Sequence, residues 1–164
     1  MFDGGVRKVA RHQQYFGIKE AIARIKQFDL NNTRKGGVIW HTQGSGKSLT
    51  MVMLGRCLAL DKTIANPRII IVTDRDDLDK QIKGTFKSCE MEPIRARSGA
   101  HLLELIGDKK PLITTIINKF SSALGGGAFR DDSADIFVLV DESHRTQSGR
   151  YGGYGDFAKK MRRI

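Results

Sequence analysis

The residues with the clearest chemistry lie in one Gly-rich stretch, which runs His41-Thr42-Gln43-Gly44-Ser45-Gly46-Lys47-Ser48. Glycines allow the backbone to curl and to aim successive N–H groups at one small anion. A helix that begins directly after such a loop adds the positive end of its dipole. Lys47 can reach the β and γ phosphates of a triphosphate, and the Ser48 hydroxyl can ligate Mg²⁺. The stretch therefore predicts a site for a nucleoside triphosphate with Mg²⁺, formed by Thr42, Gln43, Gly44, Ser45, Gly46, Lys47 and Ser48.

One position of this stretch departs from the general phosphate-loop pattern G-x-x-x-x-G-K-[ST]. His41 stands at the first position, where the pattern has Gly, whereas Gly46, Lys47 and Ser48 match it. The apolar residues before the loop and the helical spacing after it supply the strand–loop–helix context that the pattern needs. An ordinary Gly-Ser turn before a helix remains the alternative interpretation of the stretch.

A second group of polar residues follows the most apolar segment of the chain, 136–140. Hydrolysis of a phosphate anhydride needs one carboxylate to position hydrated Mg²⁺ and another to orient the attacking water. We expect Asp141 to serve the metal and Glu142 to serve the water, and we count Lys47, Asp141 and Glu142 as catalytic. On their own the two carboxylates could equally be solvated groups that close a strand.

The remaining pattern predicts strands that alternate with helices. Continuously apolar strands of this kind indicate an α/β fold with a mainly parallel sheet and helices on both faces. Ligands of such sheets lie at the carboxyl ends of the strands, so the loop and Asp141 should come together. Trp40 ends an expected buried strand, which favours a core position over a base-stacking role. The expected strands cover 38–40, 68–73, 112–117 and 136–140, and the expected helices cover 14–28, 48–60, 74–86, 101–106 and 157–163.

Composition narrows the class of protein. The 164 residues suit a single domain, and 28 Lys and Arg against 18 Asp and Glu give a formal net charge of +10,. That charge favours a polyanionic partner without proving one. The two cysteines form no close pair, which argues against a zinc site and a disulfide framework,. No apolar run approaches the ~20 residues that span a bilayer, so we expect a soluble, cytoplasmic protein with no membrane partner.

Four segments together carry a resemblance to a known family. Asp141-Glu142-Ser143-His144 resembles the DEAH-type box of superfamily 2 helicases and translocases. The sequence around these motifs is similar to that of the motor (R) subunit of type I restriction–modification enzymes. In that family a histidine at the position of His41 is expected. The resemblance covers nearly the whole chain and rests on Gly37–Met51, Ile71–Gln81, Thr114–Phe120 and Asp141–Gln147.

The resemblance implies the first of two RecA-like motor domains of a phosphate-loop ATPase, with 1–164 as a partial single domain. The family couples ATP hydrolysis to translocation of double-stranded DNA before cleavage, as an ATP-dependent type I site-specific deoxyribonuclease. ATP and Mg²⁺ are the implied cofactors. The implied partners are double-stranded DNA, the modification and specificity subunits, and the rest of the R subunit. We expect 1–164 alone, without the second motor domain and the nuclease domain, to bind ATP with little turnover and not to cut DNA.

The resemblance also assigns residues outside the loop. Gln14 is implied as the reader of adenine, since an amide can pair with both a donor and an acceptor on a base edge. Gln14 could instead merely begin a helix, and threonines at strand ends often cap locally. The groups implied to contact DNA phosphates, without reading sequence, are Thr73, Asp74, Arg75, Thr114, Thr115 and Lys119.

Three other functions stay open on the sequence. A stand-alone superfamily 2 helicase fragment would separate the strands of a duplex. A phosphate-loop kinase for a small molecule would need an acceptor pocket and an Arg-rich lid, and the DEAH-type box argues against it. A non-catalytic nucleic-acid-binding module rests on the charge of +10 alone.

Overall fold

The computed structural model describes residues 2–3, 6–42, 44–73, 82–87, 91–125 and 133–141. The predicted helix over 157–163 and most of the predicted helix over 74–86 lie outside these residues, as do the proposed site residues Gln43, Asp74, Arg75 and Glu142. In chain order the elements are β1 (Phe2–Asp3), β2 (Val6–Arg7), α1 (His12–Ile25), α2 (Lys47–Leu60), β3 (Arg68–Thr73), a helical segment over 82–87, β4 (Ile94–Arg95), α4 (Gly99–Gly107), β5 (Leu112–Ile116), α5 (Ile117–Gly125) and β6 (Ile136–Val140).

The main sheet is parallel, as the alternation of strands and helices predicts. Within the described residues the sheet has four strands in the order β4-β5-β3-β6, and all three pairings are parallel. Ile71 of β3 is level with Thr114 of β5 and with Leu139 of β6. Every residue of β3 is buried, because a neighbouring strand lies on each side and helices cover both faces. A separate antiparallel pair joins β1 to β2.

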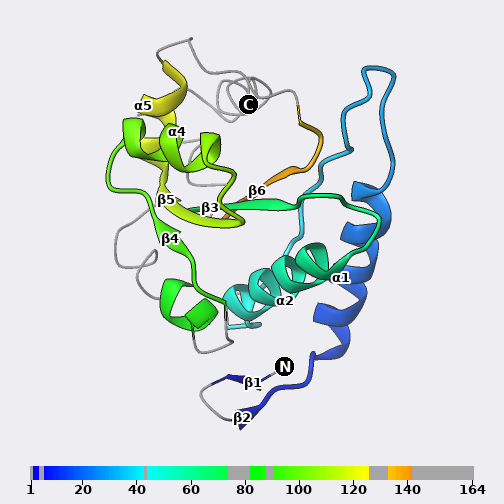
Figure 1. The fold of residues 1–164 in the computed structure, drawn as a ribbon. Helices are drawn as coiled ribbons and strands as arrows, with labels where there is room; N and C mark the ends of the chain where they lie inside the picture. Colours follow the sequence, from blue (N-terminus) through cyan, green and yellow to red (C-terminus); the bar gives the residue numbers. More distant parts are fainter. Residues whose placement is uncertain are drawn as a thin grey trace.

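Alternation along the strands builds two hydrophobic cores. In β3, Ile69 and Ile71 pack with α2 and with the partly buried face of α1, whereas Ile70 and Val72 pack with α4 and α5. Successive residues of a strand point to opposite faces, which explains the division. Figure 1 shows the result, with α1 and α2 on one side of the sheet and α4 and α5 on the other. The predicted α/β fold with helices on both faces is confirmed.

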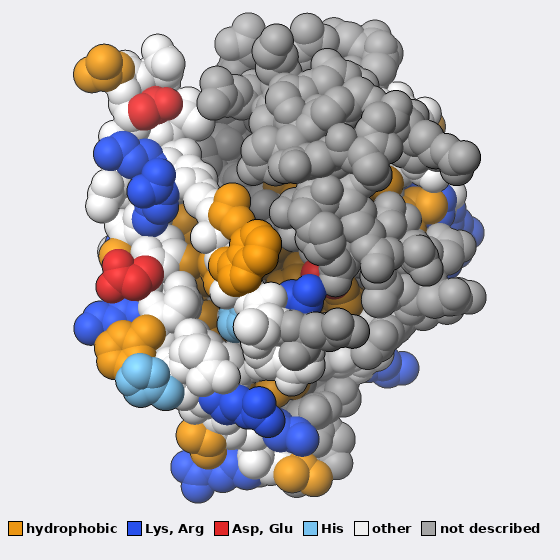
Figure 2. Space-filling view, turned by 180° about the vertical axis from the view of Figure 1, so that it is seen from behind, with side chains coloured by type: hydrophobic (Ala, Val, Ile, Leu, Met, Phe, Trp, Pro, Cys, Tyr) orange, Lys and Arg blue, Asp and Glu red, His pale blue; other side chains and the backbone are white. Residues whose placement is uncertain are grey.

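The prediction of a buried strand over 38–40 is wrong, both in secondary structure and in burial. These residues form no strand, and the side chains of Val38 and Trp40 are 69% and 86% exposed. The expected core position of Trp40 is therefore also wrong. Figure 2 shows hydrophobic side chains gathered on one face of the molecule, close to Lys and Arg side chains. Four residues before this segment, Arg34 donates a hydrogen bond to the carbonyl of Ala134, which lies just before β6.

An ion pair joins the carboxyl ends of the two helices on the α2 side of the sheet. Lys26 Nζ lies 2.7 Å from Asp61 Oδ2, directly after α1 and α2 end. The Lys26 ammonium, followed by the hydroxyl and backbone N–H of Thr63, holds the pKa of Asp61 well below its ordinary value. A carboxyl with a lowered pKa in the folded state contributes stability above its unfolded pKa of about 3.9 and loses that contribution as the pH falls.

We therefore expect the variant Asp61→Asn to unfold in acid with a shallower dependence on pH below about pH 4 than the original chain. The measurement is the midpoint of urea unfolding between pH 2.5 and pH 7. Asp108→Asn is a matched control, because Asp108 is 56% exposed and lies 3.9 Å from its Lys110 partner. Equal pH profiles for Asp61→Asn and Asp108→Asn would contradict this role of Asp61.

None of the helices within the described residues is long and apolar enough to cross a membrane.

Candidate phosphate-binding site

The Gly-rich stretch forms a tight loop that leads directly into α2. Gly46 is the residue before the helix, with φ 87° and ψ 37°, and Gly44 has φ 75°. Both values lie in the left-handed region, which glycine adopts without the steric cost that other residues meet. The Ser45 N–H donates to the Thr42 carbonyl at 3.3 Å and closes the turn. The two glycines thus give the loop the tight curl that the sequence predicts.

The proposed phosphate and metal ligands begin α2. Lys47 and Ser48 are its first two residues, and both side chains are half-buried. The first N–H groups of a helix have no partner within the helix and can meet an anion. Hard oxygen donors are the ligands that Mg²⁺ prefers, and the Ser48 hydroxyl and the Asp141 carboxylate both supply them. Within the described residues, no group of three or more His, Cys, Asp and Glu could hold a metal ion.

Gln14 lies against the loop, 32 residues away in sequence. Its side chain is 3% exposed, and its Nε2 donates to the Gly46 carbonyl and to Thr50 Oγ1, both at 3.2 Å. Its Oε1 accepts from the backbone N–H of Arg11 at 2.9 Å. The amide thereby fastens the start of α1 to the end of the loop. Reading of adenine by Gln14 stays a proposal, and it would require the amide to release at least one of these bonds.

The close approach of Gln14 makes Gly46 sensitive to any side chain. A Cβ at position 46 would lie 2.8 Å from Gln14 Nε2, in a backbone conformation that already disfavours it,. We expect Gly46→Ala to cost about 1–2 kcal/mol of stability from backbone strain, with a further cost from displaced hydrogen bonds. Chemical denaturation measures the loss. Gly84→Ala is the control, since a Cβ there meets nothing within 4 Å and Gly84 lies in a helix. An equal or smaller loss at Gly46 would contradict this view of the loop.

Asp141 lies at the carboxyl edge of the sheet, as expected. It directly follows β6, and its N–H donates to the Val72 carbonyl at 2.9 Å. Val140 pairs with Val72, so Asp141 comes level with Thr73 at the end of β3. Leu139 packs with the α2 side of the sheet, and continued alternation directs Asp141 to that same side,. Glu142, the proposed water-orienting residue, lies outside the described residues.

The residues proposed to contact DNA do not form one exposed surface in the described part of the chain. Thr73 is 1% exposed, and Thr114 and Thr115 are fully buried. Because Thr114 and Thr115 are adjacent in β5, their side chains point to opposite faces of the sheet,. Lys119 is half-buried, and its Nζ donates to the Ala96 carbonyl at 3.4 Å. Asp74 and Arg75 lie outside the described residues, and the DNA contacts as a set stay a proposal.

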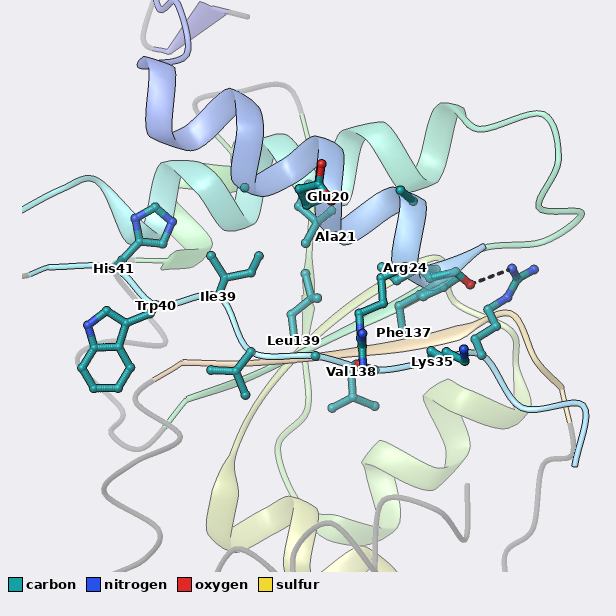
Figure 3. Close-up of a pocket in the computed structure, with 18 of the residues that line it drawn as sticks. Glu20, Ala21, Arg24, Lys35, Ile39, Trp40, His41, Phe137, Val138 and Leu139 are labelled. Carbon is teal, nitrogen blue, oxygen red and sulfur yellow. Dashed lines mark hydrogen bonds between the residues drawn. The ribbon is translucent and has the colours of Figure 1, made fainter. Parts of the chain in front are cut away.

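A cleft opens where the predicted strand 38–40 does not form. It has a volume of about 1050 Å³, and its walls are α1, the segment 34–42 and β6. Figure 3 shows Leu139 pointing from β6 toward Ala21 of α1, whereas the Trp40 ring turns away from α1. His41, Thr42 and Ser45 also line the cleft, so it reaches the beginning of the phosphate loop.

The structure also reveals contacts that the sequence did not. Thr50 Oγ1 bonds the Gly46 carbonyl at 3.2 Å, and its spacing of four residues on a helix is the only signal of that contact,. His41, which departs from the general phosphate-loop pattern, bonds Ser45 within the loop. Arg34 has no signal in the sequence, because two of its three hydrogen-bond partners lie about 100 residues away.

A parallel α/β sheet, a Gly-rich loop that opens a helix, and an aspartate at the carboxyl edge define the class of phosphate-loop nucleotide-binding domains. Comparison with protein families is consistent with that class, because residues 13–164 match the SWI2/SNF2 ATPase family. The chain belongs to this family.

Several curated proteins are similar to the chain along most of its length. It is 34% identical over 153 residues to the "Type I restriction enzyme HindI endonuclease subunit" of Haemophilus influenzae, which covers 88% of this chain and 14% of that protein. It is also 34% identical over 163 residues to the "Putative type I restriction enzyme MjaIXP endonuclease subunit" of Methanocaldococcus jannaschii, with 94% and 15% covered. The similarity that the motifs suggested is confirmed. The chain spans about a seventh of the length of these relatives.

Proposed function

We propose that the chain is the ATP-binding and ATP-hydrolysing motor segment of a type I restriction endonuclease R subunit. In this proposal ATP hydrolysis is coupled to translocation of double-stranded DNA before cleavage. The observation that carries the proposal is the loop with Gly44 and Gly46 at positive φ, which opens α2. The similarity to named endonuclease subunits supports the biological setting.

Different residues of the site would contact different parts of a bound triphosphate. Backbone N–H groups of the loop and the start of α2 meet phosphate oxygens, and Lys47 adds a positive charge. Ser48 and Asp141 would hold Mg²⁺, which when bound neutralises charge on the phosphates and fixes their geometry. Glu142 would orient the attacking water. Gln14 keeps α1 against the loop through Gly46 and Thr50, and so maintains the shape of the site.

The DNA side of the proposal rests on charge and on residue type. The formal net charge of +10 attracts a polyanion over long range,. Hydroxyl, amide and cationic groups suit phosphate contacts that position a duplex without reading its sequence. The residues that we propose for this contact are Thr73, Asp74, Arg75, Thr114, Thr115 and Lys119. The burial of the three threonines means that they would contact DNA only after neighbouring segments move.

The proposal includes the wider setting of the family. Further segments of the R subunit, and the modification and specificity subunits, are the proposed protein partners, in the cytoplasm of the cell. Target sequence would then be read outside this chain, which agrees with a contact to phosphates rather than to bases.

Release of phosphate from ATP·Mg²⁺, with and without double-stranded DNA, tests the proposed function. We expect the 164-residue chain to bind ATP and to hydrolyse it slowly, and Lys47→Ala to remove that residual turnover. Fast turnover that DNA stimulates would contradict the expected low activity. A chain that neither binds nor hydrolyses ATP would overturn the proposed function as a whole.

Two further assays separate the alternatives. Displacement of a triplex-forming strand without separation of the duplex favours translocation in the longer protein, whereas strand separation favours a helicase. Transfer of the γ-phosphate to a small acceptor would favour a kinase.

A further inference from the structure

The Ser45 hydroxyl fixes a hydrogen-bond direction within the phosphate loop. Ser45 Oγ lies 2.7 Å from the Thr42 carbonyl oxygen and 3.1 Å from His41 Nδ1. A carbonyl has no hydrogen to give, so the short contact between the two oxygens uses the only hydrogen of the hydroxyl. The contact with His41 must therefore run the other way, with Nδ1–H as the donor and Ser45 Oγ as the acceptor.

This direction assigns the tautomer of His41. A neutral imidazole that carries its hydrogen on Nδ1 has a bare lone pair on Nε2. Nε2 is buried and has no hydrogen-bond partner among the groups that the structure describes. The contact with Ser45 is therefore the one hydrogen bond that the described groups make with this ring. The orientation of the ring thus depends on its bond to Ser45.

We propose that His41 is a positioning residue of the phosphate loop, which acts through Ser45 and not through its own charge. The proposal rests on the proposed binding of ATP. The chain of bonds from His41 Nδ1 to Ser45 Oγ and on to the Thr42 carbonyl braces the turn that contains Gly44. Glycine, which the general pattern has at this position, has no side chain that could donate to Ser45 Oγ. In this chain the histidine side chain supplies that donor.

The first test is the tautomer itself. Nitrogen NMR of the histidine rings at pH 8, assigned by comparison with His41→Asn, should show a hydrogen on Nδ1 of His41 and none on Nε2. A hydrogen on Nε2 alone would overturn the inference. This readout needs no nucleotide, so it is independent of the proposed function.

The second test is the affinity for ATP·Mg²⁺ in a set of variants of the full chain. His41→Ala and Ser45→Ala should each lower it about three- to tenfold, the equivalent of one neutral hydrogen bond. The double variant should be no weaker than either single variant, because both remove the same brace. His41→Asn should retain most of the affinity, since its amide nitrogen can replace Nδ1, whereas His41→Gln should not. His101→Ala, in α4 on the other side of the sheet, is the control.

The pH dependence separates positioning from direct attraction of phosphate. Nδ1 carries a hydrogen in both the neutral and the charged ring, so the loss in His41→Ala should be the same at pH 6 and pH 8. A loss that grows at pH 6, or additive losses in the double variant, would overturn the inference. Loss of affinity in Lys47→Ala with none in His41→Ala would overturn it and leave the proposed function standing. If Lys47→Ala also keeps full affinity, the proposed function itself fails.

Discussion

Replacing Lys47 with Ala should lower the affinity for ATP·Mg²⁺ by about ten- to a hundredfold. A hydrogen bond to a charged group contributes about 1.5–3 kcal/mol, and each 1.4 kcal/mol is a tenfold change in affinity. Lys47 is the first residue of α2, beside the left-handed Gly46, where its ammonium adds to the positive end of the helix,. Titration calorimetry at constant ionic strength measures the difference.

The control for this experiment is Lys62→Ala. Lys62 is an exposed residue just beyond the far end of α2, so its removal changes the net charge equally without touching the loop. If general attraction by the +10 charge accounts for binding, the two variants lose the same small amount of affinity, and that loss shrinks with added salt,. Unfolding of Lys47→Ala must be followed in parallel, so that a lost site is not mistaken for a lost contact.

Replacing Arg34 with Ala should lower the free energy of unfolding by about 2–4 kcal/mol. Its guanidinium donates to the Ala134 carbonyl at 2.7 Å, to Asp135 Oδ1 at 2.9 Å and to the Ile25 carbonyl at 3.3 Å. The side chain is only 14% exposed, so Ala would leave these acceptors poorly solvated,. The Arg34 bonds link the end of α1 to the two residues that directly precede β6.

Aromatic contacts add to the effect of Arg34. The guanidinium carbon lies 4.7 Å from the centroid of the Phe28 ring and 5.7 Å from that of Phe137, within the range of cation–π attraction,. Arg34→Lys keeps the positive charge but not the planar guanidinium with its several donors. We therefore expect a loss of stability between zero and that of Arg34→Ala.

Lys35→Ala serves as the matched control for Arg34, because exposed Lys35 makes one long bond, 3.3 Å, to Gln27. Chemical denaturation should show a change within about 0.5 kcal/mol for this variant. An Arg34→Ala chain as stable as Lys35→Ala would show that the Arg34 bonds do not hold the segment before the phosphate loop.

Three of the four described strands of the central sheet could be predicted from the sequence, because composition alone defines them. The run of isoleucine and valine in 68–73 and the apolar run 136–140 match β3 and β6 residue for residue. Such strands are covered on both faces and need no alternation to be identified. The helix α2 was likewise expected within one residue of its observed start, because the phosphate-loop pattern places a helix directly after Gly46,.

Other elements could not be predicted because long-range contacts decide them. Val38-Ile39-Trp40 has the composition of a strand, but a strand also needs a partner edge, and the residues lie unpaired beside β6,. The sequence does not predict α5, although Ile117, Phe120 and Ala123 recur every three residues, because the apolar run 112–117 includes Ile117 in the preceding strand,. Two-residue strands such as β4 are too short to give a pattern.

Some features of the candidate site could be predicted from the sequence, and others depend on contacts that the sequence does not specify. The loop and Asp141 follow from residue type and spacing, and their placement at one edge of the sheet follows from the rule for parallel sheets. The bond from Gln14 to Gly46 could not be foreseen, because nothing local to Gln14 places it against a loop 32 residues away. The brace between His41 and Ser45 depends on the curl of the loop, which side-chain spacing does not specify.

Competition between nucleotides tests the central claim most directly. The loop should bind the β and γ phosphates, so ATP with Mg²⁺ should displace a fluorescent ATP analogue from the chain, and AMP at the same concentration should not. The claim predicts at least a tenfold difference between the two nucleotides, and it predicts that this difference disappears in Lys47→Ala. Equal displacement by AMP and ATP, with the original chain folded, would contradict the assignment of His41 to Ser48 as a phosphate-binding loop.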